Sequence, residues 1–127
     1  MTEFKVNPTY QKHQIKSLEK NLQEVRDSDI FFIFGDRAYI RGCRKLDSET
    51  IPLINLAIKL DKPFILCLDN SLPLNEQIYL RGLCPTKNTQ VFSFDPNKYS
   101  GMELYKRMMN LLENAINKEV VKDPFVD

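Results

Sequence analysis

Two short apolar segments, residues 30–34 and 64–68, constrain the fold of this chain more than any other feature of its sequence. Each is too short for a buried helix, and each is rich in the aromatic and branched residues that strands favour. An uninterrupted apolar strand fits a sheet that is covered on both faces, as parallel sheets are. Residues 51–60, between the two segments, carry the apolar pattern of a buried helix. This strand–helix–strand order predicts a right-handed parallel crossover.

The segments on either side add further elements. Residues 3–6 have a weak strand pattern, and Asn7-Pro8 combines a helix cap with a proline at the first helical position. The helix predicted from there carries apolar residues at spacings of three and four, and it ends at the polar Arg26-Asp27-Ser28. Residues 35–46 are polar and contain two glycines, so they are predicted to form a loop.

The second half of the chain predicts two helices and a strand. Residues 74–80 are predicted to form a short helix that Gly82 ends, and residues 90–94 alternate as in a strand. Ser100-Gly101-Met102-Glu103 has the form of a capping box and opens a last helix. The apolar face predicted for that helix consists of Tyr105, Met108, Met109, Leu112, Ala115 and Ile116.

Length and composition fit one α/β domain. The chain has 127 residues, of which 43% are hydrophobic, and this is enough for one core. We predict a three-layer domain over residues 1–117 with a mostly parallel sheet of four to five strands, followed by a charged, loosely held tail over residues 118–127. The predicted core includes Phe32, Ile54, Leu66 and Met108.

Charge and residue types exclude several classes of function. With 18 basic and 17 acidic residues, the composition favours neither nucleic acid nor a membrane surface as a partner. His13 is the only histidine and the three cysteines have no short spacing, so we expect no metal site and no cofactor. The polar amino terminus and the short apolar runs predict a cytoplasmic protein without a signal peptide or membrane span.

Polar residues gather where the two predicted parallel strands end. Gly35, Asp36 and Arg37 follow the first strand, and Asp69 and Asn70 follow the second. Ligands of open α/β sheets bind outside the carboxyl ends of the strands. Glycine allows close approach of the backbone, aspartate accepts hydrogen bonds from sugar hydroxyls, and arginine binds phosphate or carboxylate. A surface loop with a local ion pair is the alternative explanation.

A second polar group stands at the start of the helix predicted over residues 51–60. Asp47, Ser48 and Glu49 lie where free backbone amides and the helix dipole attract anions. Capping of the helix by Asp47 or Ser48 explains the same residues. The sequence is compatible with capping alone or with capping and ligand binding together.

Ser28-Asp29 before the first strand, Asp47-Ser48-x-Thr50 and Lys62-Pro63 before the second strand resemble the pattern of nucleoside 2-deoxyribosyltransferases and of related TIR-like domains. The pattern covers the middle third of the chain. The resemblance implies a flavodoxin-like, Rossmann-like sandwich that binds a nucleoside or nucleotide. These families use a helix glutamate at an N-glycosidic bond, commonly nine residues before the lysine, where this chain has Leu53. Glu49 lies one helical turn earlier.

Three functions remain open on the sequence alone. The first is a binding domain for a nucleotide- or nucleoside-derived small ligand with weak or lost catalysis; Leu53 favours this function and the third over the second, and the polar groups at one sheet edge favour it over the third. The second is an active transferase or hydrolase, a nucleoside deoxyribosyltransferase or NAD glycohydrolase, with Glu49 as its catalytic residue. The third is a TIR-like interaction module with an exposed apolar surface. The candidates for that surface are Leu72, Leu74, Ile78 and Leu83. Homo-oligomerisation is left open.

Overall fold

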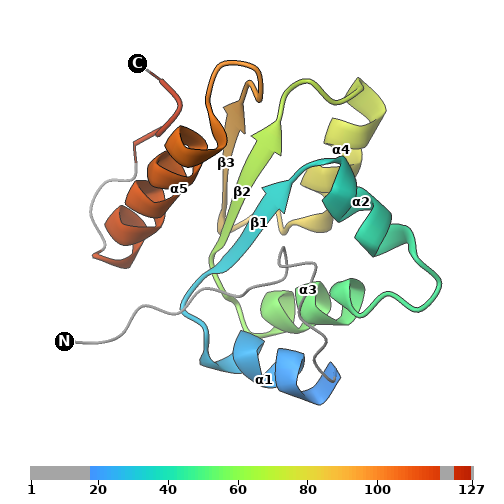
Figure 1. Cartoon of the computed structure of the whole chain (residues 1–127). Helices are drawn as coiled ribbons and strands as arrows, with labels where there is room; N and C mark the ends of the chain where they lie inside the picture. Colours follow the sequence, from blue (N-terminus) through green and yellow to red (C-terminus); the bar gives the residue numbers. More distant parts are fainter. Residues whose placement is uncertain (1–17, 118–121, 127) are drawn as a thin grey trace.

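Three parallel strands form the sheet at the centre of the fold (Figure 1). The computed structural model describes residues 18–117 and 122–126. The strands stand in the order β1 (Phe31–Gly35), β2 (Phe64–Asp69) and β3 (Thr89–Phe94), so β2 pairs with a strand on each side. The strands predicted around residues 30–34 and 64–68 are adjacent and parallel, as expected. The strand predicted over residues 3–6 lies outside the described residues, and the described sheet has three strands rather than four to five.

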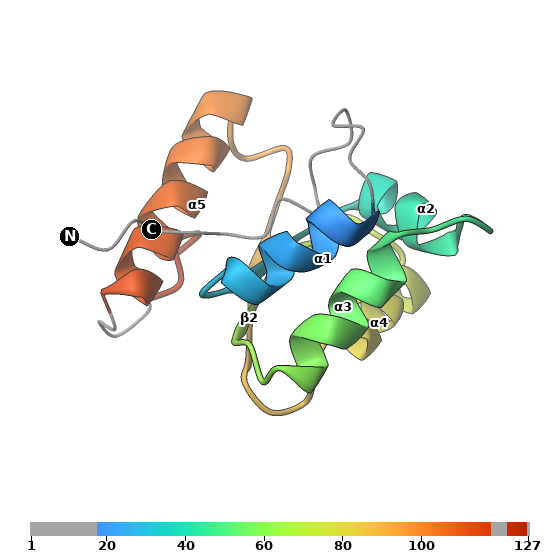
Figure 2. The same cartoon turned by 90° about the horizontal axis from the view of Figure 1, so that it is seen from below.

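The helices lie in two layers, one on each face of the sheet (Figures 1 and 2). The helices of the first layer share one core with the sheet. They are α1 (Leu18–Asp27), α2 (Arg37–Arg44), α3 (Thr50–Lys59) and α4 (Leu74–Leu83). On the opposite face, α5 (Gly101–Ile116) is the one helix of the described chain that packs on the sheet. The chain is therefore a three-layer α/β sandwich of the flavodoxin-like type.

Alternate residues of each strand enter the two cores. In β2, Leu66 packs with the layer of four helices, whereas Ile65 and Cys67 pack on the side of α5. Residues 64–68 are each at most 3% exposed. This is the pattern that uninterrupted apolar strands predict. Three of the four predicted core residues, Phe32, Ile54 and Leu66, are buried, and the fourth, Met108, is partly buried against the core under α5.

Lys62, which precedes β2, links the amino-terminal edge of the sheet to the end of α1 by hydrogen bonds. Its Nζ atom donates hydrogen bonds to the carbonyl oxygens of Arg26 at 3.0 Å and Ser28 at 2.8 Å. Ser28 is buried, and its hydroxyl donates to the carbonyl oxygen of Glu24. The last carbonyls of a helix lack partners within the helix and carry partial negative charge, so a lysine stabilises them. Ser28 and Lys62, two residues of the family-like pattern, thus have a structural role.

Residues 37–44 were predicted to be part of a loop, and this prediction is wrong because they form α2. Asp36 caps this helix, its Oδ1 accepting a hydrogen bond from the backbone N–H of Tyr39 at 2.9 Å. Tyr39, Ile40 and Cys43 are buried on one side of the helix. Four of its eight residues are apolar, but the segment is short and contains Gly42, which is typical of a loop, and packing against the core decides the conformation.

The C-terminal end of α4 and the buried face of α5 differ from the predictions. Gly82 lies inside the last turn of α4 and does not end the helix. Ser100 caps α5 as predicted, its Oγ accepting a hydrogen bond from the backbone N–H of Glu103 at 3.2 Å. The fully buried residues of α5 are Leu111 and Leu112, whereas Tyr105 and Met109, both predicted to be apolar-face residues, are exposed.

The C-terminal segment, residues 122–126, packs on the α5 side of the sheet, whereas the sequence predicts a loosely held tail. Phe125 is only 7% exposed, and its ring centroid lies 5.4 Å from that of Phe94 and 6.1 Å from that of Tyr99. The hydroxyl of Tyr99 donates a hydrogen bond to the carbonyl oxygen of Phe125 at 2.9 Å. One helix covers this face, so an aromatic side chain near the chain end finds apolar surface to bury.

Replacing Phe32 by alanine is expected to lower the free energy of unfolding by about 3–5 kcal/mol, because its ring is fully buried under α5. Urea unfolding monitored by circular dichroism measures the change. Tyr105→Ala, on the exposed face of α5, is the control and should stay within about 0.5 kcal/mol of the wild type. An equal loss in both variants would show that burial on this face is not what stabilises the fold.

Replacing Phe125 by alanine is expected to cost about 1–3 kcal/mol. The cost is smaller than for Phe32 because a terminal segment can detach locally without unfolding of the domain. Limited trypsin digestion should then cleave faster after Lys122, while Val126→Ala, at an exposed position, should leave the rate unchanged. Unchanged cleavage in Phe125→Ala would contradict the anchoring role of this ring.

Candidate functional site

The carboxyl end of β1 is shaped by packing and by helix capping. A Cβ atom on Gly35 would lie 2.8 Å from the Leu66 Cδ1 atom and 3.2 Å from the carbonyl oxygen of Cys67, so a larger residue would force these neighbours to shift. The next residue, Asp36, uses one carboxylate oxygen to cap α2. Both residues stand at the carboxyl edge, where the sequence placed them, and each has a local structural reason.

Arg37 and Glu76 connect the starts of α2 and α4. Their Nε and Oε2 atoms lie 3.8 Å apart. The arginine side chain is 56% exposed, whereas the glutamate side chain is 19% exposed. The Oε2 atom of Glu76 is buried and accepts no hydrogen bond from the described residues. A loose, partly exposed pair of this kind contributes little to stability. The glutamate therefore keeps the capacity to accept a hydrogen bond.

Asp69 and Asn70 end β2 and organise the loop that leads to α4. Oδ1 of Asp69 accepts hydrogen bonds from the backbone N–H of Ser71 at 2.9 Å and from its hydroxyl at 2.6 Å. The backbone N–H of Asn70 donates to the carbonyl oxygen of Phe94 at 3.0 Å. Gly35 pairs with Leu68 in the sheet register, so this loop and the start of α2 lie at the same edge.

Asp47, Ser48 and Glu49 stand at the start of α3. Ser48 Oγ accepts a hydrogen bond from the backbone N–H of Thr50 at 3.2 Å, so it has the capping role that the sequence allows. Glu49 occupies the cap position without a side-chain cap, and its Oε2 accepts a hydrogen bond from Asn21 Nδ2 of α1 at 3.5 Å. Asp47 is exposed. Glu49 thus points toward α1, and this hydrogen bond involves neither Asp36 nor Asp69.

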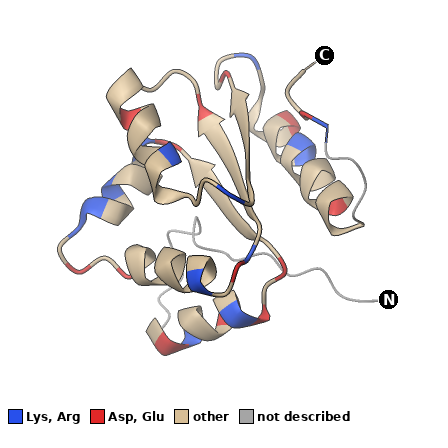
Figure 3. Cartoon of the chain, turned by 180° about the vertical axis from the view of Figure 1, so that it is seen from behind, with Lys and Arg blue, Asp and Glu red and all other residues tan. Residues whose placement is uncertain are grey.

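A groove between α2 and α4 lies next to the carboxyl end of β1. Its volume is about 450 Å³. Six residues line it: Arg37, Ile40, Arg41, Arg44, Lys45 and Glu76. Figure 3 shows the basic residues along α2. The guanidinium of Arg44 lies 4.5 Å from the ring centroid of Tyr79 on α4, a cation–π contact that holds it against the helix. Asp36, Glu49 and Asp69 are not among the lining residues of this groove.

Sequence reasoning identified one of the four groove cations, Arg37, and missed Arg41, Arg44 and Lys45. These residues fell within the segment that was predicted to be a loop. The spacing of 37, 41, 44 and 45 is the signal that would have revealed them, because residues three and four apart share a helix face. That signal becomes readable once residues 37–44 are known to be helical.

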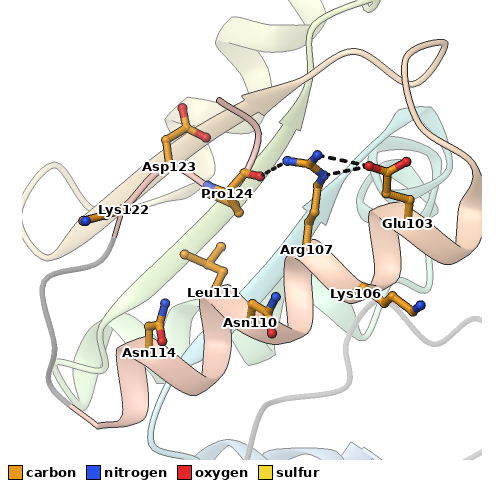
Figure 4. A pocket seen from close by; sticks show the side chains of 9 residues that line it. All are labelled: Glu103, Lys106, Arg107, Asn110, Leu111, Asn114, Lys122, Asp123 and Pro124. Atoms are coloured by element: carbon orange, nitrogen blue, oxygen red, sulfur yellow. Dashed lines mark hydrogen bonds and ion pairs between the residues drawn. The ribbon is translucent and has the colours of Figure 1, made fainter. Parts of the chain in front are cut away.

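Another cavity, of about 380 Å³, lies between α5 and the C-terminal segment (Figure 4). Arg107 bridges its two walls. Its Nη1 donates to the carbonyl oxygen of Pro124 at 2.8 Å, and its Nη2 donates to Glu103 Oε1 at 3.0 Å. The guanidinium also lies 4.5 Å from the ring centroid of Tyr99. Because its guanidinium donates hydrogen bonds to both walls, Arg107 has a structural role and attaches the C-terminal segment to α5.

Within residues 18–117 and 122–126, no cluster of three or more histidine, cysteine, aspartate or glutamate residues is arranged to hold a metal ion. No helix in the same part of the chain is long and apolar enough to cross a membrane.

Comparison of the chain with protein-family models, with curated proteins and with solved structures found no match.

The cysteines are expected to be unreactive in the folded protein. Burial raises the pKa of the Cys43 thiol from 9.0 to about 11, the nearby Arg44 charge lowering it only in part, and burial raises the pKa of Cys84 to about 12. Burial also raises the pKa of Cys67. All three thiols stay neutral at pH 7.5, and the thiolate is the nucleophile. Iodoacetamide should therefore label them slowly in buffer and fast in urea.

The same shifts set the pH dependence of stability. The folded state holds the thiol protons more tightly than the unfolded state, so this contribution is fully present below pH 9.0 and is lost as pH rises toward 11. Fast labelling of Cys43 in the folded protein at pH 7.5 would contradict the burial of this thiol.

Proposed function

We propose that this chain is a binding domain for a nucleotide-type small ligand that carries a ribose and phosphate, with the ligand at the carboxyl edge of the sheet. The observation that carries the proposal is the groove between α2 and α4, where Arg37 and further cations line one wall and Glu76 lines the other. Carboxyl ends of parallel strands are the usual ligand sites of this architecture. The resemblance to nucleoside 2-deoxyribosyltransferases and TIR-like domains is the reason for expecting a nucleoside as part of the ligand.

The two sides of the groove fit the two chemical parts of such a ligand. Arginine matches phosphate because its planar guanidinium donates paired hydrogen bonds. Glu76 Oε2 is buried without a hydrogen-bond donor among the described residues, and such an acceptor is costly to leave unsatisfied. A ribose hydroxyl supplies the missing donor. A ligand with phosphate at one end and hydroxyls at the other satisfies both sides at once.

An N-glycosidase or transferase that uses Glu49 has less support. Glu49 contacts Asn21 on α1 and does not line the groove beside Arg37. Leu53, at the position where the resembling families have their glutamate, is buried in the core with α2 and α4. Catalysis as the main function would require Glu49→Gln to abolish turnover of nucleosides or of oxidised nicotinamide dinucleotide without loss of stability.

An interaction module has one specific observation in its favour. Leu74 and Ile78, one turn apart on α4, are 73% and 59% exposed, whereas Leu72 is buried and Leu83 is partly buried. Apolar side chains that are exposed singly or in pairs are common on protein surfaces and do not by themselves mark an interface. We therefore place ligand binding first.

Isothermal titration calorimetry with adenosine, adenosine monophosphate and ribose 5-phosphate tests the proposal. The two phosphorylated compounds should bind, and Arg37→Gln should weaken them about tenfold or more, as expected for a charged hydrogen bond. Stability should barely change, because the ion pair of Arg37 is loose and exposed. Arg81→Gln, which removes an exposed charge outside the groove lining, is the matched control.

Glu76→Gln separates the two parts of the ligand. It should weaken ribose 5-phosphate, because an amide is a poorer acceptor than a carboxylate, while inorganic phosphate binds equally or more tightly once the negative charge is gone. Hydrogen exchange should show protection in residues 36–44 and 69–76 on ligand addition. Absence of binding across the series, or protection confined to another surface, would overturn the proposed function.

A further inference from the structure

Three arginines on one face of α2 and Lys45 at its C-cap place four cationic side chains along one groove. Arg37, Arg41, Arg44 and Lys45 follow each other at spacings of four, three and one along α2 and its cap. The single carboxylate among the lining residues is Glu76, so the groove has a net charge of +3. This local excess contrasts with the whole chain, whose net charge is +1.

The helix dipole favours Arg41 and Arg44 in the last turn of α2, but the spacing of the four charges opposes the stability of the helix. Arg41 is four residues from both Arg37 and Lys45, and like charges at this spacing destabilise a helix. Arg37 also stands at the amino-terminal end, where the helix dipole disfavours a cation. The side chains of Arg41 and Lys45 make no hydrogen bond or ion pair with the part of the chain that the structure describes, and both residues are exposed. An anion bound in the groove removes this repulsion.

The length of the cationic face indicates the size of the anion. Arg37 and Arg44 are separated by two turns, about 11 Å along the helix axis. A single phosphate group reaches one end of such a row, whereas a linear chain of phosphates reaches along it. Tyr79 holds the Arg44 guanidinium at the far end at 4.5 Å, which fixes one donor before any ligand binds.

We infer that the α2–α4 groove prefers a phosphate chain of two or three groups, so that a nucleoside diphosphate or triphosphate binds there more tightly than a monophosphate. This inference rests on the proposed function for the nucleoside part of the ligand. Arg41 and Lys45 are the residues that distinguish the longer phosphate chain, because Arg37 alone serves a single phosphate.

Calorimetry with inorganic orthophosphate, pyrophosphate and tripolyphosphate tests the phosphate chain without a nucleoside. Affinity should rise at least tenfold from orthophosphate to tripolyphosphate and fall with added salt. In the double variant Arg41→Gln, Lys45→Gln, tripolyphosphate should bind no more than about threefold more tightly than orthophosphate. Neither side chain has a partner within the described residues, so the double variant should fold as the wild type does.

The matched control is Lys59→Gln with Lys87→Gln. Lys59 ends α3 and Lys87 precedes β3, so both lie toward the amino-terminal edge of the sheet, and the variant loses the same charge. Its tripolyphosphate affinity should stay within twofold of the wild type. Equal losses in the two double variants would show a general charge effect and would overturn the groove as the site.

Titrations with adenosine nucleotides distinguish failure of this inference from failure of the proposed function. Adenosine triphosphate, diphosphate and monophosphate should bind in decreasing order of affinity. If all three bind equally and Arg41 and Lys45 are dispensable, the phosphate-chain inference fails and the proposed function stands. If tripolyphosphate binds in the groove but none of the adenosine compounds binds more tightly than its inorganic counterpart, the proposed function fails. Stronger binding of a single-stranded RNA than of any nucleotide would overturn a small ligand as the occupant.

Discussion

The burial of β2 on both faces is the constraint on which the rest of the structure depends. Its side chains alternate between the core shared with α1–α4 and the core under α5, and both cores therefore meet on this strand. The backbone of β2 is paired on both sides, with β1 and with β3. A polar residue anywhere in residues 64–68 would be desolvated on one face or the other, which explains why the segment is apolar without interruption.

The position of the candidate site follows from this packing. Gly35 lets β1 approach Leu66 and Leu80, and α2 begins directly after it with Asp36 as its cap. Ile40 buries one side of α2 in the first core, and this leaves the charged side toward α4. The groove thus forms because α2 packs at this position, and its charges lie on the face of α2 that is not buried in the core.

The α2–α4 groove and the cavity beside the C-terminal segment differ in what their arginines do. In the cavity beside the C-terminal segment, Arg107 donates to Glu103 and to the carbonyl oxygen of Pro124, and it serves the fold. In the α2–α4 groove, the contact of Arg37 is a loose pair at 3.8 Å, and Glu76 retains a buried acceptor. A ligand gains most from donors and acceptors that are already held in position but do not hydrogen-bond within the protein.

The sequence by itself determined the layered α/β architecture, because uninterrupted apolar strands have few stable arrangements, and it determined the parallel pairing of β1 with β2. It also located Asp36, Arg37 and Asp69 at the carboxyl edge, since strand ends are readable from composition. Only the tertiary structure decided that residues 37–44 are a helix, that Glu49 points toward α1 and that Phe125 is buried. The physical reason is the same in each case. Each feature lies in a short segment, and the conformation of that segment or the direction of its side chain is set by the elements that it packs on.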